Sequence, residues 1–148
     1  MRLNDALDGI TRLGLDTPPI IYLIEQHPAY LPLVRPVFQQ ISAGTVSGFT
    51  SVMTLVEVLT LPLARGYGEL AQQYRHVLLG SHNFLTVDIT TPVAERAADL
   101  RARYRLRTPD ALQLAAALAH GCQAFLTNDR DLVRVAELRM IVIDELEP

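Results

Sequence analysis

Short hydrophobic runs alternate along this chain with segments in which apolar residues recur every three or four positions. Runs of the first kind are typical of buried strands, and segments of the second kind are typical of amphipathic helices. The hydrophobic runs predict five strands. They fall within residues 11–16, 45–51, 83–89, 123–128 and 140–144.

Helical segments precede the first strand and separate the first four strands from one another. Pro18 and Pro19 suit the first turn of a helix through residues 20–26, because a proline there gives up only a donor that is already free. Further helical spacing is found in residues 3–10, 33–42 and 69–79.

Hydroxyl residues mark where three other helices begin. Thr50 or Ser51 is the predicted cap of one helix, whose apolar stripe is predicted to be Val52, Leu55, Val56 and Leu59. Thr91 and Thr108 each precede a proline and are predicted to cap two later helices, the second of which ends near Gly121.

Strands that are separated by helices favour a parallel sheet with helices packed on both faces. Repeats, linkers and low-complexity segments are absent, so residues 1–148 are predicted to form a single domain. A chain of this length buries roughly two-thirds of its unfolded surface. We therefore expect an α/β fold that needs neither a disulfide nor a structural zinc.

The composition and charge of the chain exclude several classes of protein. All 13 basic residues are arginine and the net charge is −3, which excludes a Walker or Schiff-base lysine and argues against general nucleic-acid binding. Cys122 is the only cysteine, and the first residues lack the apolar core of a signal peptide. Polar residues interrupt the uncharged stretch 36–56, so it does not resemble a membrane helix. We expect a cytoplasmic protein that does not enter a membrane.

Three aspartates occur where parallel sheets bind ligands, beyond the carboxyl ends of the strands. Asp16 ends the first predicted strand, Asp129 follows the fourth, and Asp110 lies at the second position of a predicted helix. Each also has a structural interpretation, because a strand-end aspartate commonly makes a turn and a first-turn aspartate complements the helix dipole.

Glu57 is the only charged residue between Arg35 and Arg65. A buried carboxylate is costly unless it is paired or bound to a metal, although Glu57 could instead lie on a solvated face with polar neighbours. Two carboxylates about 4 Å apart repel each other by about 4 kcal/mol at an effective dielectric near 20. A cluster of four would therefore take up protons or bind hard cations such as Mg²⁺ or Mn²⁺.

Three stretches, LDTPPIIYLIE, TSVMTLVEVL and TPDALQLAAALAHGCQAFLTNDRDL, together resemble the PIN-domain ribonucleases, especially the VapC-type toxins of bacterial toxin–antitoxin pairs. The resemblance runs from about Leu13 to the C-terminus. It implies a PIN-like three-layer α/β/α fold with a central parallel sheet of about four to five strands. It also implies a metal-dependent endoribonuclease.

The resemblance assigns roles to individual residues. It implies that the catalytic, metal-binding quartet is Asp16, Glu57, Asp110 and Asp129, holding Mg²⁺ or Mn²⁺, with Asp131 as a candidate fifth acid and Thr127 as a supporting hydroxyl. Pro18, Pro19 and Leu132 depart from the usual residues of the family, without removing a carboxylate.

The family further implies an RNA substrate, a homodimer, and an antitoxin whose tail blocks the acidic pocket. The alternative is a catalytically inactive PIN-fold binding module that acts through protein partners. The arginine run before Asp110 bears on the substrate. Arg105 and Arg107 are candidates for holding RNA phosphates, and the alternative for the run, which also includes Arg101 and Arg103, is a solvated last turn of a helix.

Overall fold

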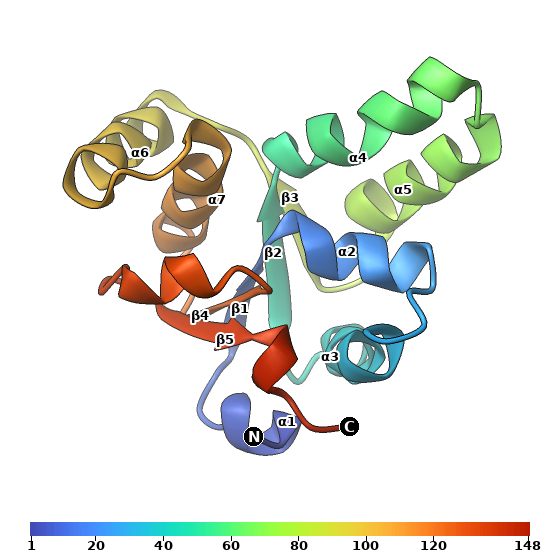
Figure 1. Cartoon of the computed structure of the whole chain (residues 1–148), viewed down its shortest axis with the longest axis horizontal. Helices are drawn as coiled ribbons and strands as arrows, with labels where there is room; N and C mark the ends of the chain where they lie inside the picture. The colour runs from blue at the N-terminus through green and yellow to red at the C-terminus, as the bar shows by residue number, and fades with distance from the viewer.

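The computed structural model describes residues 1–148 and has a five-stranded, fully parallel sheet at its centre (Figure 1). The strand order is β3-β2-β1-β4-β5. The strands are β1 Arg12–Leu15, β2 Ser47–Ser51, β3 Phe84–Val87, β4 Ala124–Thr127 and β5 Arg139–Val142. Each lies within or overlaps one of the five hydrophobic runs.

Seven α-helices connect and flank the strands. They are α1 Leu3–Ala6, α2 Thr17–Ile24, α3 Leu31–Ala43, α4 Val52–Arg65, α5 Gly68–Gly80, α6 Thr91–Tyr104 and α7 Thr108–Ala119. Two short 3-10 turns, η1 Arg130–Arg134 and η2 Ile143–Glu145, follow β4 and β5. None of the helices is long and apolar enough to span a membrane.

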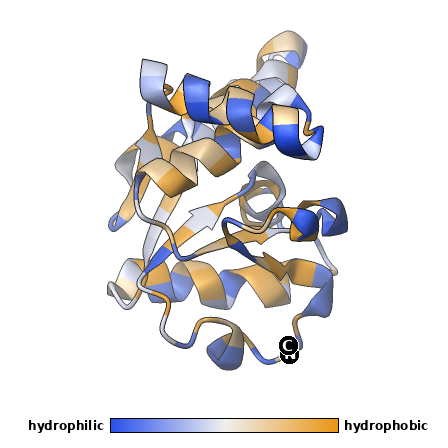
Figure 2. Ribbon diagram, turned by 90° about the vertical axis from the view of Figure 1, so that its left-hand side faces the viewer, coloured by the Kyte–Doolittle hydropathy of each residue, from blue (hydrophilic) through white to orange (hydrophobic).

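The helices lie on both faces of the sheet and form three layers with it (Figure 1). One hydrophobic cluster includes Leu13 and Leu15 of β1 and residues of α2 to α5, and the other includes Phe125 of β4 and residues of α6 and α7. Figure 2 shows hydrophilic and hydrophobic residues alternating along the helices, as expected when one face meets a core and the other meets solvent. The predicted three-layer α/β/α fold is confirmed.

Gly14 in β1 allows close packing of α7 on the sheet. A Cβ at this position would lie 2.7 Å from the Phe125 side chain and 2.8 Å from that of Ala117. Because both neighbours belong to the packed core, neither can easily give way. Glycine at the centre of β1 therefore fixes the depth at which α7 sits.

The helix caps differ from the predicted ones by one residue in two cases. Ser51 caps α4 by accepting a hydrogen bond from Met53 N at 3.2 Å, as one of the two alternatives predicted. The cap of α6 is Thr90, however, and the residue at the cap position of α7 is Arg107. Both prolines thus occupy the second helical position, where a missing N–H is equally harmless.

The predicted apolar stripe of α4 is wrong in part. Leu55 and Leu59 are half-buried and pack against the core, but Val56 is 61% exposed. The residues that α4 buries are Thr54, Val58 and Pro62. The helix is rotated relative to the prediction because the polar Thr54 finds hydrogen-bond partners beneath it, as described below.

Candidate active site

The carboxyl ends of three neighbouring strands form the floor of the candidate site. β1 lies between β2 and β4, and the chain leaves β1 and β4 in opposite directions across the sheet. Such a switch point opens a crevice at the carboxyl edge of the strands. Asp16 follows β1 directly, and Asp129 lies two residues beyond the end of β4.

Asp16 is the buried acid of this edge, with only 7% of its surface exposed. It caps α2: one carboxylate oxygen accepts a hydrogen bond from Thr17 N at 2.9 Å, and the other accepts one from Thr127 Oγ1 at 2.8 Å. Burial raises the pKa of Asp16 to about 6 against the opposing effect of these two hydrogen bonds, and the negative charges of Asp110 and Glu57 raise it further. Three of the four predicted acids therefore interact electrostatically.

Asp110 reaches the site from α7. This helix precedes β4 and runs antiparallel to it, so its first turn lies at the carboxyl edge of the sheet. Asp110 is the third residue of the helix, not the second as predicted, and 15% of its side chain is exposed. Its carboxylate forms an ion pair with Arg107 Nε at 3.3 Å.

Glu57 lies in the second turn of α4 and is exposed, which agrees with the solvated-face alternative and not with a buried carboxylate. It is nevertheless tied to the site, because its Oε1 accepts a hydrogen bond from Thr17 Oγ1 at 3.0 Å. Thr17 is the neighbour of Asp16 and is itself buried. Glu57 is thus oriented by a residue that follows β1.

Asp129 is connected to Asp16 through Thr127. The Thr127 hydroxyl donates to Asp16 and accepts a hydrogen bond from Asp129 N at 3.1 Å. The Asp129 carboxylate caps η1 by accepting from Asp131 N at 2.9 Å, in agreement with the turn-making interpretation. Asp131 is more remote: its side chain is 70% exposed and forms an ion pair with Arg134 at 3.2 Å.

A buried polar network beneath these acids was missed by the sequence analysis. Its centre is Gln113 on α7, whose Oε1 accepts hydrogen bonds from Ser51 N and Ser51 Oγ at 3.2 and 2.6 Å. Its Nε2 donates to Thr17 Oγ1 at 3.1 Å and to Thr54 Oγ1 at 2.7 Å. A glutamine one turn beyond Asp110 in an alanine- and leucine-rich helix was the available signal.

The residues fit a hard divalent cation by type, because the site is built from carboxylate and hydroxyl oxygens without sulfur or imidazole. The side chains are not gathered tightly, and no three acidic, histidine or cysteine side chains lie close enough together to hold an ion as they stand. The pKa of Asp16 is raised by burial and by repulsion from Asp110 and Glu57, and a bound cation would offset both effects. Convergence of Asp110 and Glu57 on an ion would require side-chain rotation.

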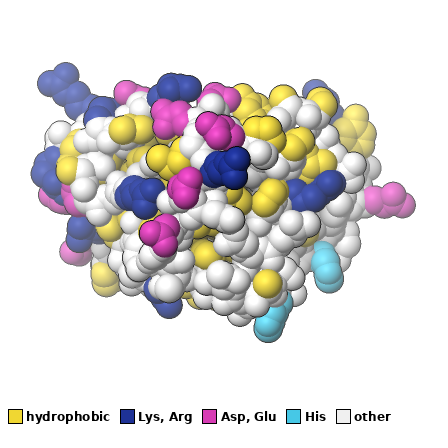
Figure 3. Space-filling view, turned by 90° about the horizontal axis from the view of Figure 1, so that it is seen from below, with side chains coloured by type: hydrophobic (Ala, Val, Ile, Leu, Met, Phe, Trp, Pro, Cys, Tyr) yellow, Lys and Arg dark blue, Asp and Glu magenta, His cyan; other side chains and the backbone are white.

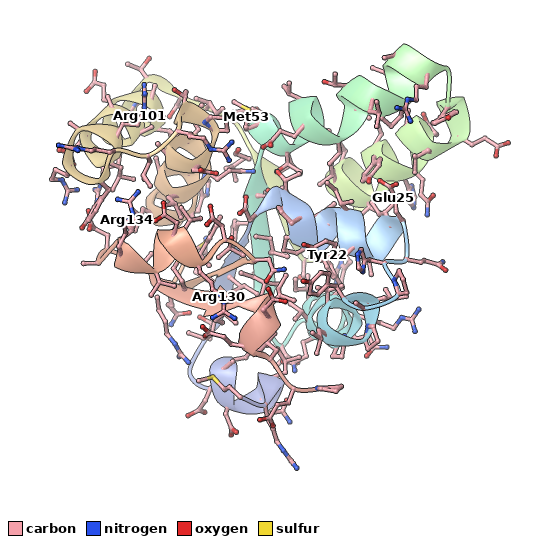
Figure 4. All side chains as sticks on the ribbon, viewed as in Figure 1. Tyr22, Glu25, Met53, Arg101, Arg130 and Arg134 are labelled. Atoms are coloured by element: carbon pink, nitrogen blue, oxygen red, sulfur yellow. The ribbon has the colours of Figure 1, made fainter.

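The arginine run of residues 101–107 lies beside the site, and its members make different contacts. Arg101 Nε donates to Leu106 O, and Arg103 pairs with Asp99 and Glu137. Figure 4 shows Arg101 on α6 and Arg134 where η1 meets α6. Arg105 ends α6 with φ 55° and an exposed side chain. The side chains of Arg105 and Arg107, the two arginines nearest Asp110, thus donate to neither Leu106 O nor Glu137.

On the face of the molecule seen from below, no broad basic region adds to the positive charge of Arg105 and Arg107. Figure 3 shows acidic and basic side chains interspersed there. This distribution agrees with the net charge of −3.

An apolar groove between α2, α4 and α5 begins at Glu57 and has a volume of about 190 Å³. Glu25 and Tyr74, which are joined by a hydrogen bond, line it together with Leu61 and Tyr67. Figure 4 shows Glu25 pointing from α2 towards α5, whereas Tyr22 of the same helix points towards α3. The groove thus leads away from the acidic site along α4.

The model of the PIN domain matches residues 14–138, and the chain belongs to this family. The matched segment contains all four acids of the candidate site. No curated protein sequence matches the chain.

Several solved structures share the fold. A toxin–antitoxin complex from Klebsiella pneumoniae contains a chain with 24% identity and a TM-score of 0.67, and the match covers 90% of this chain and 98% of that one. VapBC2 from Rickettsia felis, bound to a DNA fragment from its promoter, gives 17% identity and a TM-score of 0.71 over 89% and 98% of the two chains. FitAB bound to a DNA fragment gives 20% identity and a TM-score of 0.69 over 93% and 99%.

Proposed function

We propose that this protein is a metal-dependent endoribonuclease that hydrolyses RNA phosphodiesters. PIN domains are generally nucleases and typically use divalent metals. The observation that carries the proposal is the position of Asp16 at the switch point of the sheet, where burial raises its pKa to about 6 and the negative charges of Asp110 and Glu57 contribute further to the rise. A buried carboxylate with a perturbed pKa in a crevice is typical of a functional site.

The proposed ligands of Mg²⁺ or Mn²⁺ are Asp16, Glu57, Asp110 and Asp129, with Asp131 as a further candidate. When bound, the ion would activate water and stabilise the charge that develops on the phosphodiester. Thr127 and Thr17 hold the Asp16 carboxylate in one orientation, and Thr17 also holds Glu57. Arg105 and Arg107 are proposed to hold RNA phosphates beside Asp110.

RNA cleavage assays with purified protein test the proposal. The protein should cleave RNA with Mg²⁺ or Mn²⁺ and lose this activity in a chelator. Asp110→Asn should retain the circular dichroism spectrum of the fold and lose cleavage. Asp8→Asn is the matched control, because Asp8 is an exposed residue outside the site, and it should cleave normally. Undiminished cleavage by Asp110→Asn would contradict the proposed role.

We further propose that the protein is the toxin of a toxin–antitoxin pair and that it acts in the cytoplasm as a homodimer. Several structures with the same fold are described as toxin–antitoxin, VapBC or FitAB complexes, which supports an antitoxin partner. The apolar groove at Glu57 is a suitable place for the antitoxin tail. The single cysteine is buried and unpaired, consistent with a reducing compartment. Co-expression with the product of the adjacent gene should suppress RNA cleavage if that product is the antitoxin.

A catalytically inactive binding module is the second candidate, favoured by the ion pair between Arg107 and Asp110 and by the loose arrangement of the acids. In such a module the arginine would serve as the permanent counter-ion of Asp110. Calorimetric titration with Mn²⁺ separates the candidates, because the enzyme must bind the ion and the module need not. Binding that is lost in Asp16→Asn would favour the enzyme.

A further inference from the structure

Gln113 lies beneath three of the segments that carry the candidate acids. It belongs to the same helix as Asp110, it contacts Thr17 next to Asp16, and it contacts Ser51 and Thr54 at the start of the helix that carries Glu57. Its side chain is only 3% exposed, and Ser51 and Thr54 are fully buried. All side-chain polar atoms buried in the protein have hydrogen-bond partners, including those of Gln113.

The direction of each hydrogen bond around Gln113 follows from chemistry. Ser51 N–H can only donate, so the Gln113 atom that faces it is the carbonyl oxygen Oε1. The amide nitrogen Nε2 must then face the other way and donate to the hydroxyl oxygens of Thr17 and Thr54. The hydrogen bond from Ser51 N–H alone therefore determines the orientation of the Gln113 amide.

The hydroxyl protons are assigned in the same way. Thr50 Oγ1 donates its only proton to Leu15 O at 2.9 Å, so in the 2.8 Å contact between Thr50 and Thr54 the donor is Thr54. Thr54 then has no second proton for Thr17, and Thr17 accepts from Gln113. The Thr17 proton is left for the Glu57 carboxylate at 3.0 Å, which is a stronger acceptor than the Thr54 hydroxyl at 3.2 Å.

We infer that Gln113 is a positioning residue for Glu57. By donating to both threonines, it directs the Thr17 hydroxyl proton to Glu57 Oε1 and holds an exposed, flexible carboxylate beside Asp16. This inference rests on the proposed function for its catalytic meaning, since Glu57 is proposed there as a metal ligand. The position that Gln113 imposes on Glu57 exists with or without an ion.

Gln113→Met tests the inference, because methionine has a similar length and shape but cannot donate. In the crystal structure of the metal-free variant, the Thr17 Oγ1 to Glu57 Oε1 separation should exceed hydrogen-bonding distance, while the wild-type protein should keep it. Mn²⁺ affinity, measured by calorimetry, should fall roughly tenfold, as is usual when a residue that orients a metal ligand is removed. In a Thr17→Val background, Gln113→Met should cause little additional loss of affinity.

Ser51→Ala is the matched control. It removes a hydrogen bond to the same amide and a helix cap, but it leaves Ser51 N–H and both Nε2 bonds in place. It should lower the melting temperature without changing the Thr17–Glu57 separation or Mn²⁺ affinity. The inference is overturned if Gln113→Met retains the wild-type Thr17–Glu57 bond, or if Ser51→Ala breaks it equally. Failure of the proposed function would appear differently, as wild-type protein that neither binds Mn²⁺ nor cleaves RNA, and the crystallographic distances would still decide the role of Gln113.

Discussion

Thr127 donates a hydrogen bond to Asp16 across 111 positions of sequence, at a distance of 2.8 Å. The same hydroxyl accepts from Asp129 N, so one side chain joins the acids that follow two neighbouring strands. Thr127 is fully buried, and Asp16 is 7% exposed. The bond therefore lies where a charged carboxylate is costly, and it partly offsets the cost of burying Asp16.

Asp16 should make stability depend on pH in a defined direction. Its pKa is about 6 in the folded protein against an ordinary value of 3.8, so between these values the folded state binds more protons than the unfolded state. The free energy of unfolding attributable to Asp16 must then fall as pH rises through this window, by about 3 kcal/mol in total.

Asp16→Asn removes the titrating group and should flatten this part of the profile. Urea unfolding in a chelator, from pH 4 to pH 8, measures the difference between the two proteins. Parallel pH profiles of the free energy of unfolding for wild type and variant would show that the pKa of Asp16 is not raised by folding.

Glu57→Gln should change stability little in metal-free protein, because Glu57 is exposed and its hydrogen-bond donor Thr17 can also serve a glutamine oxygen. Loss of repulsion with Asp16 should keep the melting temperature level or raise it slightly. The rise in melting temperature on adding Mn²⁺ should shrink, since ligand stabilisation follows RT ln(1 + [L]/Kd). Thermal melts with and without Mn²⁺ measure both effects.

Glu95→Gln is the control for this experiment, because Glu95 is an exposed residue of α6. Its Mn²⁺-induced rise should equal that of the wild type. An undiminished rise in Glu57→Gln would remove Glu57 from the set of metal ligands.

Arg105→Gln and Arg107→Gln should each weaken RNA binding, and the salt dependence of binding should become shallower by about one unit of slope per lost phosphate contact. Fluorescence anisotropy with single-stranded RNA in a chelator, over a series of salt concentrations, measures affinity without cleavage. Arg35→Gln, an exposed position on α3, should bind like the wild type. Equal slopes in all four proteins would assign the arginine run to the solvated end of α6.

Leu63→Asp should disrupt the proposed homodimer. Val56 and Leu63 are 61% and 58% exposed and lie seven positions apart on α4, so they share one face of the helix. Exposed apolar stripes of this kind commonly mark interaction surfaces. Analytical ultracentrifugation should show a monomer for Leu63→Asp and a dimer for Leu79→Asp, which places the same charge at an exposed leucine of α5. The opposite pattern would move the interface to α5.

The sequence by itself determined the succession of strands and helices along the chain, because a buried strand and an amphipathic helix each require a particular spacing of apolar residues. It also placed Asp16, Asp110 and Asp129 at the carboxyl edge of the sheet, since strand ends and helix starts are local features. These patterns predict a parallel sheet with helices on both faces, which the structure confirms. The PIN family was implied by the resemblance of three stretches of the sequence, and the family model confirms it. The metal-binding roles of the acids stay predictions.

Tertiary structure decided which faces and side chains meet. Thr54 is buried and Val56 exposed, against the pattern of hydrophobicity, because Gln113 from a helix 59 positions away supplies a buried partner for the Thr54 hydroxyl. Glu57 is held by Thr17, which lies 40 positions earlier in the chain. Such pairings depend on the distances between elements that are remote in sequence, and hydrophobic periodicity carries no information about those distances.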